Sequence, residues 1–332
     1  MNSMILTSRY LFNEIPDGHK KVEEFGRKAC NLSLAKKWQF YVPDTVFLSG
    51  ELVREIYEQK SIPTEILSHF ENKLLAIRPS PVLGHFAKSE QFLHIGLDNQ
   101  SFDVLIKRVG VTNASAIYIS FLRVFALTIY NLDLENCDEL RRLLEISKSE
   151  KRVSRESVFN KISRIKQLIS LETGSVFPRS TAEQLIAVIN SIYKSWISPT
   201  QKILREVSGR NSEESIPIIL QEMHSGITGS PVEYFKVKNF DDKTGRSSLK
   251  CYRLDNKSNH SSYILINAKE VNKLFKENSL ENLIRTLTKK VNSPLEVNFL
   301  LEGDTLFLIG LKDIELPQNK FIEFVVSSVK EN

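Results

Sequence analysis

The stretch TGSVFPRSTAEQLIAVINSIYKSWISPTQKILRE, from Thr173 to Glu206, marks a change in the character of the chain. Residues 101–207 have a helical pattern, because apolar side chains recur at intervals of three and four and glycine is scarce. After residue 209, short apolar runs between turn residues predict strands at 216–220, 234–237, 249–254, 263–266, 294–301 and 305–311. A helix is expected at 268–290, and Glu302-Gly303-Asp304 predicts a hairpin between the last two strands. These patterns predict an α+β protein.

The first hundred residues mix both kinds of element. The patterns predict strands at 5–12, 46–48 and 75–78, and helices at 21–37, 51–60 and 63–74. Ser49 is the expected N-cap of the helix that starts at Glu51. We therefore expect three parts: an α/β lobe at 1–100, a helical insert at 101–207 and a strand-rich second lobe at 208–332.

Composition indicates an ordinary globular protein. The 332 residues are 41% hydrophobic and 26% charged, and the 45 basic and 40 acidic residues give a net charge of +5. This excess is mild and spread out, so we expect no nucleic-acid partner. The three cysteines are far apart, which favours a reducing compartment and gives no metal-site spacing. No apolar run approaches the ~20 residues of a membrane helix and the start does not read as a signal peptide, so we expect a cytoplasmic protein without a membrane partner.

The most specific motifs lie in the opening stretch. TGSVFPRSTAEQL and YKSWISPTQKILRE resemble T-G-x-x-F-P-x-x-x-x-E-Q-L and K-S-W-x-x-P-R-A-x-x-Y-R of pyruvate phosphate dikinase, with Trp196 and Pro199 as the anchors. Residues 26–51, GRKACNLSLAKKWQFYVPDTVFLSGE, resemble the G-G-K-G-A-N-L and V-P-P-G-F segments of the dikinase and of phosphoenolpyruvate synthase. Residues 77–99 match V-R-S-G-A and L-G-L-N-D at their two ends, and IILQEM at 218–223 is similar to V-x-V-Q-x-M. Four colinear segments thus resemble the N-terminal, ATP-binding region of this family.

The resemblance implies a two-lobed ATP-grasp-like fold that binds ATP and Mg²⁺ and passes a phosphoryl group to a histidine on a separate swivelling domain. It covers the ATP-binding region alone, because the sequence contains neither the T-x-H phosphohistidine motif nor the barrel domain of the full enzyme. We therefore expect a protein partner, such as a separate phosphohistidine domain.

The same resemblance implies a set of site residues. Lys28, Arg78 and Gln221 stand at nucleotide- and phosphate-binding positions, and Lys312 stands where the family's L-Q-T-R has its arginine. Glu296 and Asn298 replace the two carboxylates of D-I-E-F, and alternation along a strand places them on one face. Such a pair could ligate Mg²⁺ together with phosphates. From the residues alone, each of these positions also fits an ordinary polar side chain on a helix face or a strand.

Several positions depart from the family. Pro79 and Pro81 remove backbone N–H donors from the loop after Arg78. The glycine-rich S-G-T-G-V-x-F-T-R-D-P is replaced at 232–242 by VEYFKVKNFDD, in which Glu233 and Phe235 are expected to obstruct the approach to phosphates. The glutamine of L-Q-T-R becomes Gly310, the arginine of S-W-x-x-P-R becomes Thr200, and Lys312 cannot reproduce a bidentate arginine contact.

Other catalytic patterns are weak. The six histidines form no metalloprotease motif, and His85 and His224, which fall near the expected cleft, fit surface histidines as well. No catalytic residue is assigned. Three functions remain open: a pseudoenzyme that contacts a partner, an active kinase-type transferase whose acceptor histidine lies on another protein, and a nucleotide sensor. The retained Lys28 and Arg78 and the lost glycine loop favour the first and the third.

Overall fold

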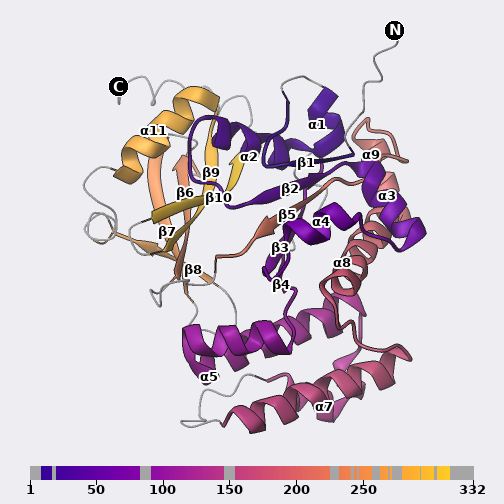
Figure 1. The fold of residues 1–332 in the computed structure, drawn as a ribbon. Coiled ribbons are helices and arrows are strands. Elements are labelled where there is room, and N and C mark those ends of the chain that lie inside the picture. Colours follow the sequence, from indigo (N-terminus) through magenta and orange to yellow (C-terminus); the bar gives the residue numbers. More distant parts are fainter. Residues whose placement is uncertain are drawn as a thin grey trace. The chain divides into compact units, whose positions relative to one another are not determined.

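The computed structural model describes the following residues: 9–16, 20–82, 91–145, 154–224, 232–240, 243–244, 247–255, 262–267, 270, 279–291, 293–302 and 305–314. The chain divides into two compact units. The first comprises Met1–Cys30 and Asp44–Gly229, and the second comprises Asn31–Pro43 and Ser230–Asn332. Within the described residues each unit contains one antiparallel five-stranded sheet (Figure 1). The prediction of an α+β protein is confirmed.

The sheet of the first unit has the order β1-β2-β5-β3-β4. Its strands are β1 (Tyr10–Phe12), β2 (Thr45–Leu48), β3 (Leu75–Pro79), β4 (Phe92–Ile95) and β5 (Ile218–Glu222). Alternation separates its two faces. One face is apolar and joins the main core through Val46, Leu48, Leu75, Ile77, Ile218 and Leu220. The opposite face presents the intervening residues Thr45, Phe47, Ala76, Arg78, Ile219 and Gln221.

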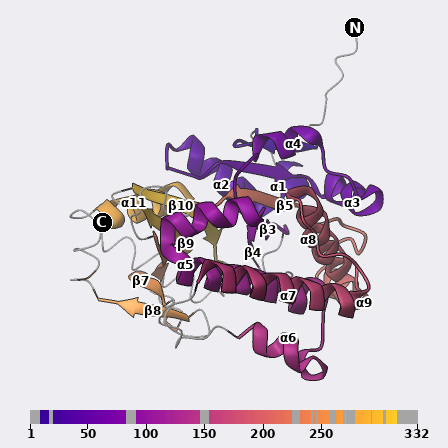
Figure 2. The ribbon, with the colours of Figure 1, turned by 60° about the horizontal axis from the view of Figure 1, so that its bottom comes forward.

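The first unit also contains most of the helices. They are α1 (Lys20–Phe25), α3 (Gly50–Gln59), α4 (Thr64–His69), α5 (Asn99–Val124), α6 (Asp138–Leu143), α7 (Arg155–Thr173), α8 (Thr181–Trp196) and α9 (Pro199–Val207). Helix α2 (Arg27–Lys37) begins in the first unit and continues into the second. Figures 1 and 2 show α5 and α7 side by side. As predicted, Ser49 caps α3, since its hydroxyl oxygen accepts the Leu52 N–H at 3.2 Å. The helix predicted at 21–37 is instead broken at Gly26, whose φ is 78°.

One helical segment, Asn99–Ile129, is long and apolar enough to cross a membrane by length and composition. The sequence does not predict a span there. The backbone of the segment breaks at Gly110, where φ is 80° and ψ is 160°. Phe102, Tyr118 and Leu122 are buried in the main core. These three residues therefore belong to the core of the first unit.

The sheet of the second unit has the order β10-β9-β6-β7-β8. Its strands are β6 (Val232–Phe240), β7 (Ser247–Asp255), β8 (Ser262–Ile266), β9 (Leu295–Glu302) and β10 (Thr305–Asp313). Each overlaps a strand that the sequence predicts. Glu302 pairs with Thr305 as the predicted hairpin requires, whereas residues 303 and 304 lie outside the described part.

Helix α11 (Ser279–Val291) packs on the apolar face of this second sheet. Leu280, Ile284 and Leu287 of the helix are buried. The side chain of Asn239 joins the layers, because its Nδ2 donates to Thr288 Oγ1 at 2.8 Å and its Oδ1 accepts the Leu295 N–H at 2.7 Å. The opposite face of the sheet carries the candidate metal pair and other polar side chains, together with Tyr234, Leu300 and Phe307.

Candidate functional site

Two of the predicted phosphate contacts, Arg78 and Gln221, lie on one face of the first sheet. Arg78 is on β3 and pairs with Ile219 of β5, while Gln221 is on β5 and pairs with Ala76 of β3. Both side chains are buried, with 9% and 1% of their surface exposed. A guanidinium and a carboxamide are expensive to remove from water unless they gain polar partners. Their placement therefore creates a buried polar patch at the edge of the core.

Thr45 completes this patch, although no sequence motif points to it. Its side chain is 1% exposed, and its register with Gln221 places it on the same face. Gln221 Nε2 donates to Thr45 Oγ1 at 3.4 Å. Threonine in a strand is an ordinary β-former, so no local signal distinguishes Thr45 from a packing residue. We call Thr45, Arg78 and Gln221 the buried polar face.

Lys28 reaches the backbone directly after Arg78. Its ammonium nitrogen donates to the carbonyl oxygen of Pro79 at 3.4 Å, and the Ala29 N–H donates to Ser80 Oγ at 3.0 Å. The start of α2 is therefore tied to the end of β3 by Lys28 and Ala29. The resemblance identified Lys28 and Arg78 from segments fifty residues apart; the structure brings the two segments together.

Ser80 makes two hydrogen bonds that could not be predicted from its position between two prolines. Its backbone N–H donates to Pro217 O at 2.9 Å, while its hydroxyl oxygen accepts from α2. Pro79 is the last residue of β3, so the strand itself accommodates its missing N–H donor. Residues 83–90, which include His85, lie outside the described part, and the expectation of a stiffened loop is untested there. His224 follows β5 and is half-buried.

The predicted metal pair lies on β9 of the second unit, on the polar face. Leu295, Val297 and Phe299 are buried on the other face, so the predicted alternation is confirmed. Glu296 pairs in register with Lys238 on β6 and with Lys312 on β10. Its carboxylate oxygens lie 3.6 Å from Lys236 Nζ and 3.8 Å from Lys238 Nζ. The Glu296 carboxylate therefore faces two ammonium groups.

Asn298 occupies the next position of the same face. It pairs with Lys236 on β6 and with Gly310 on β10. Its Oδ1 atom is buried, and no donor among the described residues reaches it. Asn31 holds the adjoining part of β10, since its amide donates to Leu311 O at 3.4 Å and to Asp313 Oδ1 at 3.0 Å. These two bonds flank Lys312 and fix its strand.

The segment that replaces the family's glycine-rich loop forms β6, a central strand. Phe235 is 1% exposed and lies on the apolar face, opposite Phe299. Its side chain therefore does not cover the polar face, contrary to the expected obstruction. The residues that β6 does place on that face are Lys236 and Lys238. The alternation Lys-Val-Lys in the sequence is enough to predict that these two lysines share one face of a strand.

The fit of Mg²⁺ to this face is poor. A magnesium ligand must direct oxygen lone pairs at the cation, and Mg²⁺ favours carboxylates. Here Glu296 directs its carboxylate at Lys236 and Lys238, and Asn298 contributes a neutral amide. No group of three His, Cys, Asp or Glu side chains suited to a metal occurs in the described residues. The donors on this face suit an anion better than a divalent cation.

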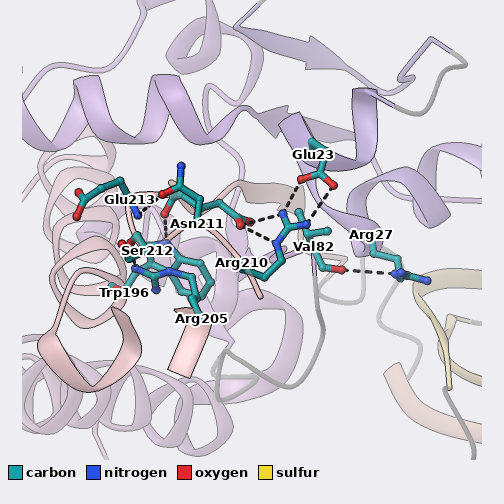
Figure 3. A network of polar contacts seen from close by, with 10 residues as sticks. Glu23, Arg27, Val82, Trp196, Arg205, Arg210, Asn211, Ser212 and Glu213 are labelled. Atoms are coloured by element: carbon teal, nitrogen blue, oxygen red, sulfur yellow. Dashed lines mark hydrogen bonds and ion pairs between the residues drawn. The ribbon is translucent and has the colours of Figure 1, made fainter. Parts of the chain in front are cut away.

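The tryptophan of the opening motif has a structural role (Figure 3). Trp196 Nε1 donates to Glu214 O at 2.5 Å. Arg205 lies over the indole ring at 4.2 Å and donates to Trp196 O at 2.8 Å and to Ser212 O at 2.6 Å. Arg205 is 1% exposed, and burial lowers its pKa. These contacts fix the segment that leads into β5 and Gln221.

A neighbouring ion pair ties α1 to the same segment. Arg210 Nη2 lies 2.5 Å from Glu23 Oε2 and 2.8 Å from Glu214 Oε2. The hydrogen bond to Glu23 raises the pKa of Arg210, and the same bond lowers the pKa of Glu23. Arg27, at the start of α2, donates to Val82 O at 3.4 Å. These contacts tie α1 and the start of α2 to the residues around them.

Comparison with known proteins assigns no family. No protein-family model matches the chain, and a search of curated proteins gives no match. Among solved structures, C-terminally truncated Cdc123 from Schizosaccharomyces pombe is similar over 57% of this chain and 79% of that chain, with 15% identity and a TM-score of 0.24. A likeness this slight supports no conclusion about fold or function.

Proposed function

We propose that this protein is a divergent, ATP-grasp-like nucleotide-binding protein that has lost efficient phosphotransfer. The observation that carries the proposal is the buried polar face with Lys28 beside it. Desolvating an ion has a penalty on the order of several kcal/mol, and the same sheet face also holds Phe47 and Ile219. Apolar residues would fit there, so the retention of Arg78 and Gln221 favours a ligand-binding role.

The chemistry of these groups suits a polyphosphate. Arg78 offers a planar fork of N–H donors, Lys28 offers a compact positive charge, and Gln221 offers an amide donor. All belong to the first unit, and they stand at the positions that the resemblance assigns to nucleotide and phosphate contacts. The α+β fold with two antiparallel sheets is compatible with a two-lobed ATP-grasp architecture.

Loss of transfer is proposed from the second unit. Phosphoryl transfer relies on metal-bound carboxylates and on cations that stabilise developing charge. Asn298 stands in place of a carboxylate, Gly310 in place of a glutamine, and Glu296 faces lysines. Such a protein would act as a sensor or pseudoenzyme in the cytoplasm, by presenting its nucleotide-dependent state to a protein partner.

Thermal unfolding of the full chain with and without millimolar ATP tests the proposal. We expect ATP to stabilise the wild type by mass action, and Lys28→Met and Arg78→Met to reduce that stabilisation. Lys289→Met, on the exposed side of α11, is the matched control and should respond as the wild type does. Absence of stabilisation by ATP would exclude nucleotide binding, and turnover of ATP to AMP and phosphate would favour the active transferase instead.

A further inference from the structure

We infer that the polar face of the second sheet is a phosphate site of its own, separate from Lys28 and Arg78, which binds the phosphate groups of a nucleoside polyphosphate through lysine ammonium groups, without Mg²⁺. The inference rests on the proposed function for the class of ligand. The face is formed by Lys236, Lys238, Glu296, Asn298 and Lys312, which we call the lysine face. Lysine would here supply the positive charge that a metal ion supplies in phosphotransferases.

The strand register places these side chains side by side. Lys238, Glu296 and Lys312 form one row across β6, β9 and β10, and Lys236, Asn298 and Gly310 form the next row on the same face. Neighbouring strands lie about 4.8 Å apart, and alternate residues along a strand lie about 6.6 Å apart. The residues of the lysine face are therefore spaced about 5 to 7 Å apart across and along the strands.

The charges on this face favour an anion. Lys236, Lys238 and Lys312 carry three positive charges, and Glu296 carries one negative charge. Two of the lysines are mostly shielded from water, since their side chains are 28% and 20% exposed, and Glu296 is 18% exposed. Reduced exposure weakens the screening of their charges by solvent and salt. A net positive, partly desolvated surface attracts phosphate and repels Mg²⁺.

Glu296 lies between two lysines of this face and offsets part of their charge. Its carboxylate oxygens are 3.6 Å from Lys236 Nζ and 3.8 Å from Lys238 Nζ, so the two ammonium groups lie close to one place. Asn298 adds an amide NH₂ group that can donate to a phosphate oxygen. Its buried Oδ1 atom is an acceptor and takes no part in binding phosphate. Gly310, which pairs with Asn298, has no side chain and leaves that position of the face without one.

The variant Glu296→Gln distinguishes phosphate binding by lysines from Mg²⁺ binding by Glu296, because the two predict opposite changes in ATP affinity. If lysines bind the phosphates, removing the only formal negative charge among these five side chains should tighten ATP binding in EDTA, by about three- to tenfold. If Glu296 ligates Mg²⁺, the same change should weaken ATP binding in the presence of Mg²⁺. The substitution keeps the size of the side chain, so we expect the fold to be retained.

Isothermal titration of the full chain with ATP and with inorganic tripolyphosphate, in EDTA and in Mg²⁺, completes the test. We expect both ligands to bind in EDTA, and Lys236→Met/Lys238→Met to weaken both by about tenfold or more. Lys289→Met is the control. Circular dichroism verifies that the double variant is folded; if it is not, the Glu296→Gln result decides.

The outcomes distinguish the two proposals. ATP binding that requires Mg²⁺ overturns the lysine face and leaves the proposed function standing. Binding of tripolyphosphate in EDTA without binding of ATP overturns the proposed function, and it also overturns a nucleoside polyphosphate as the ligand of the lysine face. If neither ligand binds under either condition, both proposals are overturned.

Discussion

Gly26 lies so close to Ser80 that a Cβ atom on Gly26 would stand 1.4 Å from the Ser80 carbonyl oxygen. Gly26 also has a φ of 78°, which L side chains rarely adopt. This contact places the first turn of α2, with Lys28, against the residues that follow Arg78. The sequence alone does not explain why a glycine is needed at position 26, because the contact that requires it is with Ser80, more than fifty residues further along the chain.

Gly26→Ala should therefore be strongly destabilising. The clash is with backbone, so α2 or the end of β3 must shift, and we expect a loss of about 3 kcal/mol or more of unfolding free energy. Urea denaturation measures it. Gly174→Ala is the matched control, because Gly174 has a φ of 66° but a Cβ added there would meet no atom within 4 Å. That control should lose only about 1 kcal/mol from backbone strain; equal losses in the two variants would contradict the close-contact explanation.

Arg205→Lys tests the structural role of the tryptophan motif. A lysine cannot stack on Trp196 as a planar guanidinium does, nor bond two carbonyl oxygens in a fork. We expect a loss of about 2–4 kcal/mol in unfolding free energy. Arg164→Lys alters an exposed ion pair with Glu139 and should leave the unfolding free energy nearly unchanged. If Arg205→Lys unfolds at the wild-type urea concentration, the stacked arginine is not a structural tie.

The helix α9 should tolerate polar substitutions on its apolar side. It buries Arg205, whereas Ile203 is 57% exposed and Val207 is 80% exposed. We expect Val207→Ser to change the unfolding free energy by less than about 0.5 kcal/mol. Val188→Ser, at a fully buried position on α8, should cost about 2 kcal/mol or more. Chemical denaturation of both variants checks this, and a large loss for Val207→Ser would mean that the α9 surface is covered.

His94 should make the fold sensitive to mild acid. Burial lowers the pKa of His94 from 6.5 to about 4, so the folded state holds the neutral form while the unfolded state takes up a proton below pH 6.5. Stability is then fully present above pH 6.5 and is lost as the pH falls towards 4. The expected loss at pH 5 is about 2 kcal/mol. Asparagine tolerates the φ of 62° at this position, which makes His94→Asn a suitable variant.

Urea unfolding at pH 7.5 and at pH 5 measures the histidine contribution. From pH 7.5 to pH 5 the wild type should lose more unfolding free energy than the His94→Asn variant does. Identical losses would show that His94 does not govern the acid sensitivity. Asp44 is held by Asn13, Lys73 and His69, and its pKa is lowered despite burial, so its own contribution is lost below this pH range.

Local patterns predicted the elements well. The alternation of Leu295, Glu296, Val297 and Asn298 is sufficient to predict a strand with one polar face, and Ser49 is sufficient to predict a cap. The helix predicted at 63–74 ends at His69, because short helices depend on tertiary packing more than on propensity. The predicted end of this helix was therefore wrong because tertiary contacts, and not local propensity, decide where it ends.

The composition of the site was harder to predict, for a physical reason. Lys28, Arg78 and Gln221 came from the resemblance, but Thr45 and Ser80 contribute through strand register and side-chain contacts that no local pattern contains. Lys236 and Lys238 were within reach, since their alternation with Val237 places them on the face of Glu296 once β6 is known to pair with β9. The pairing of β6 with β9, about sixty residues apart in the chain, could not be predicted from the sequence patterns.

The most direct test of the central claim, nucleotide binding without phosphotransfer, is a phosphorus NMR spectrum of ATP with the full chain over several hours. We predict that the three ATP resonances shift or broaden, that Arg78→Met reverses this, and that no AMP or phosphate resonance accumulates. An unchanged ATP spectrum would contradict nucleotide binding, and accumulation of AMP and phosphate would contradict the loss of transfer.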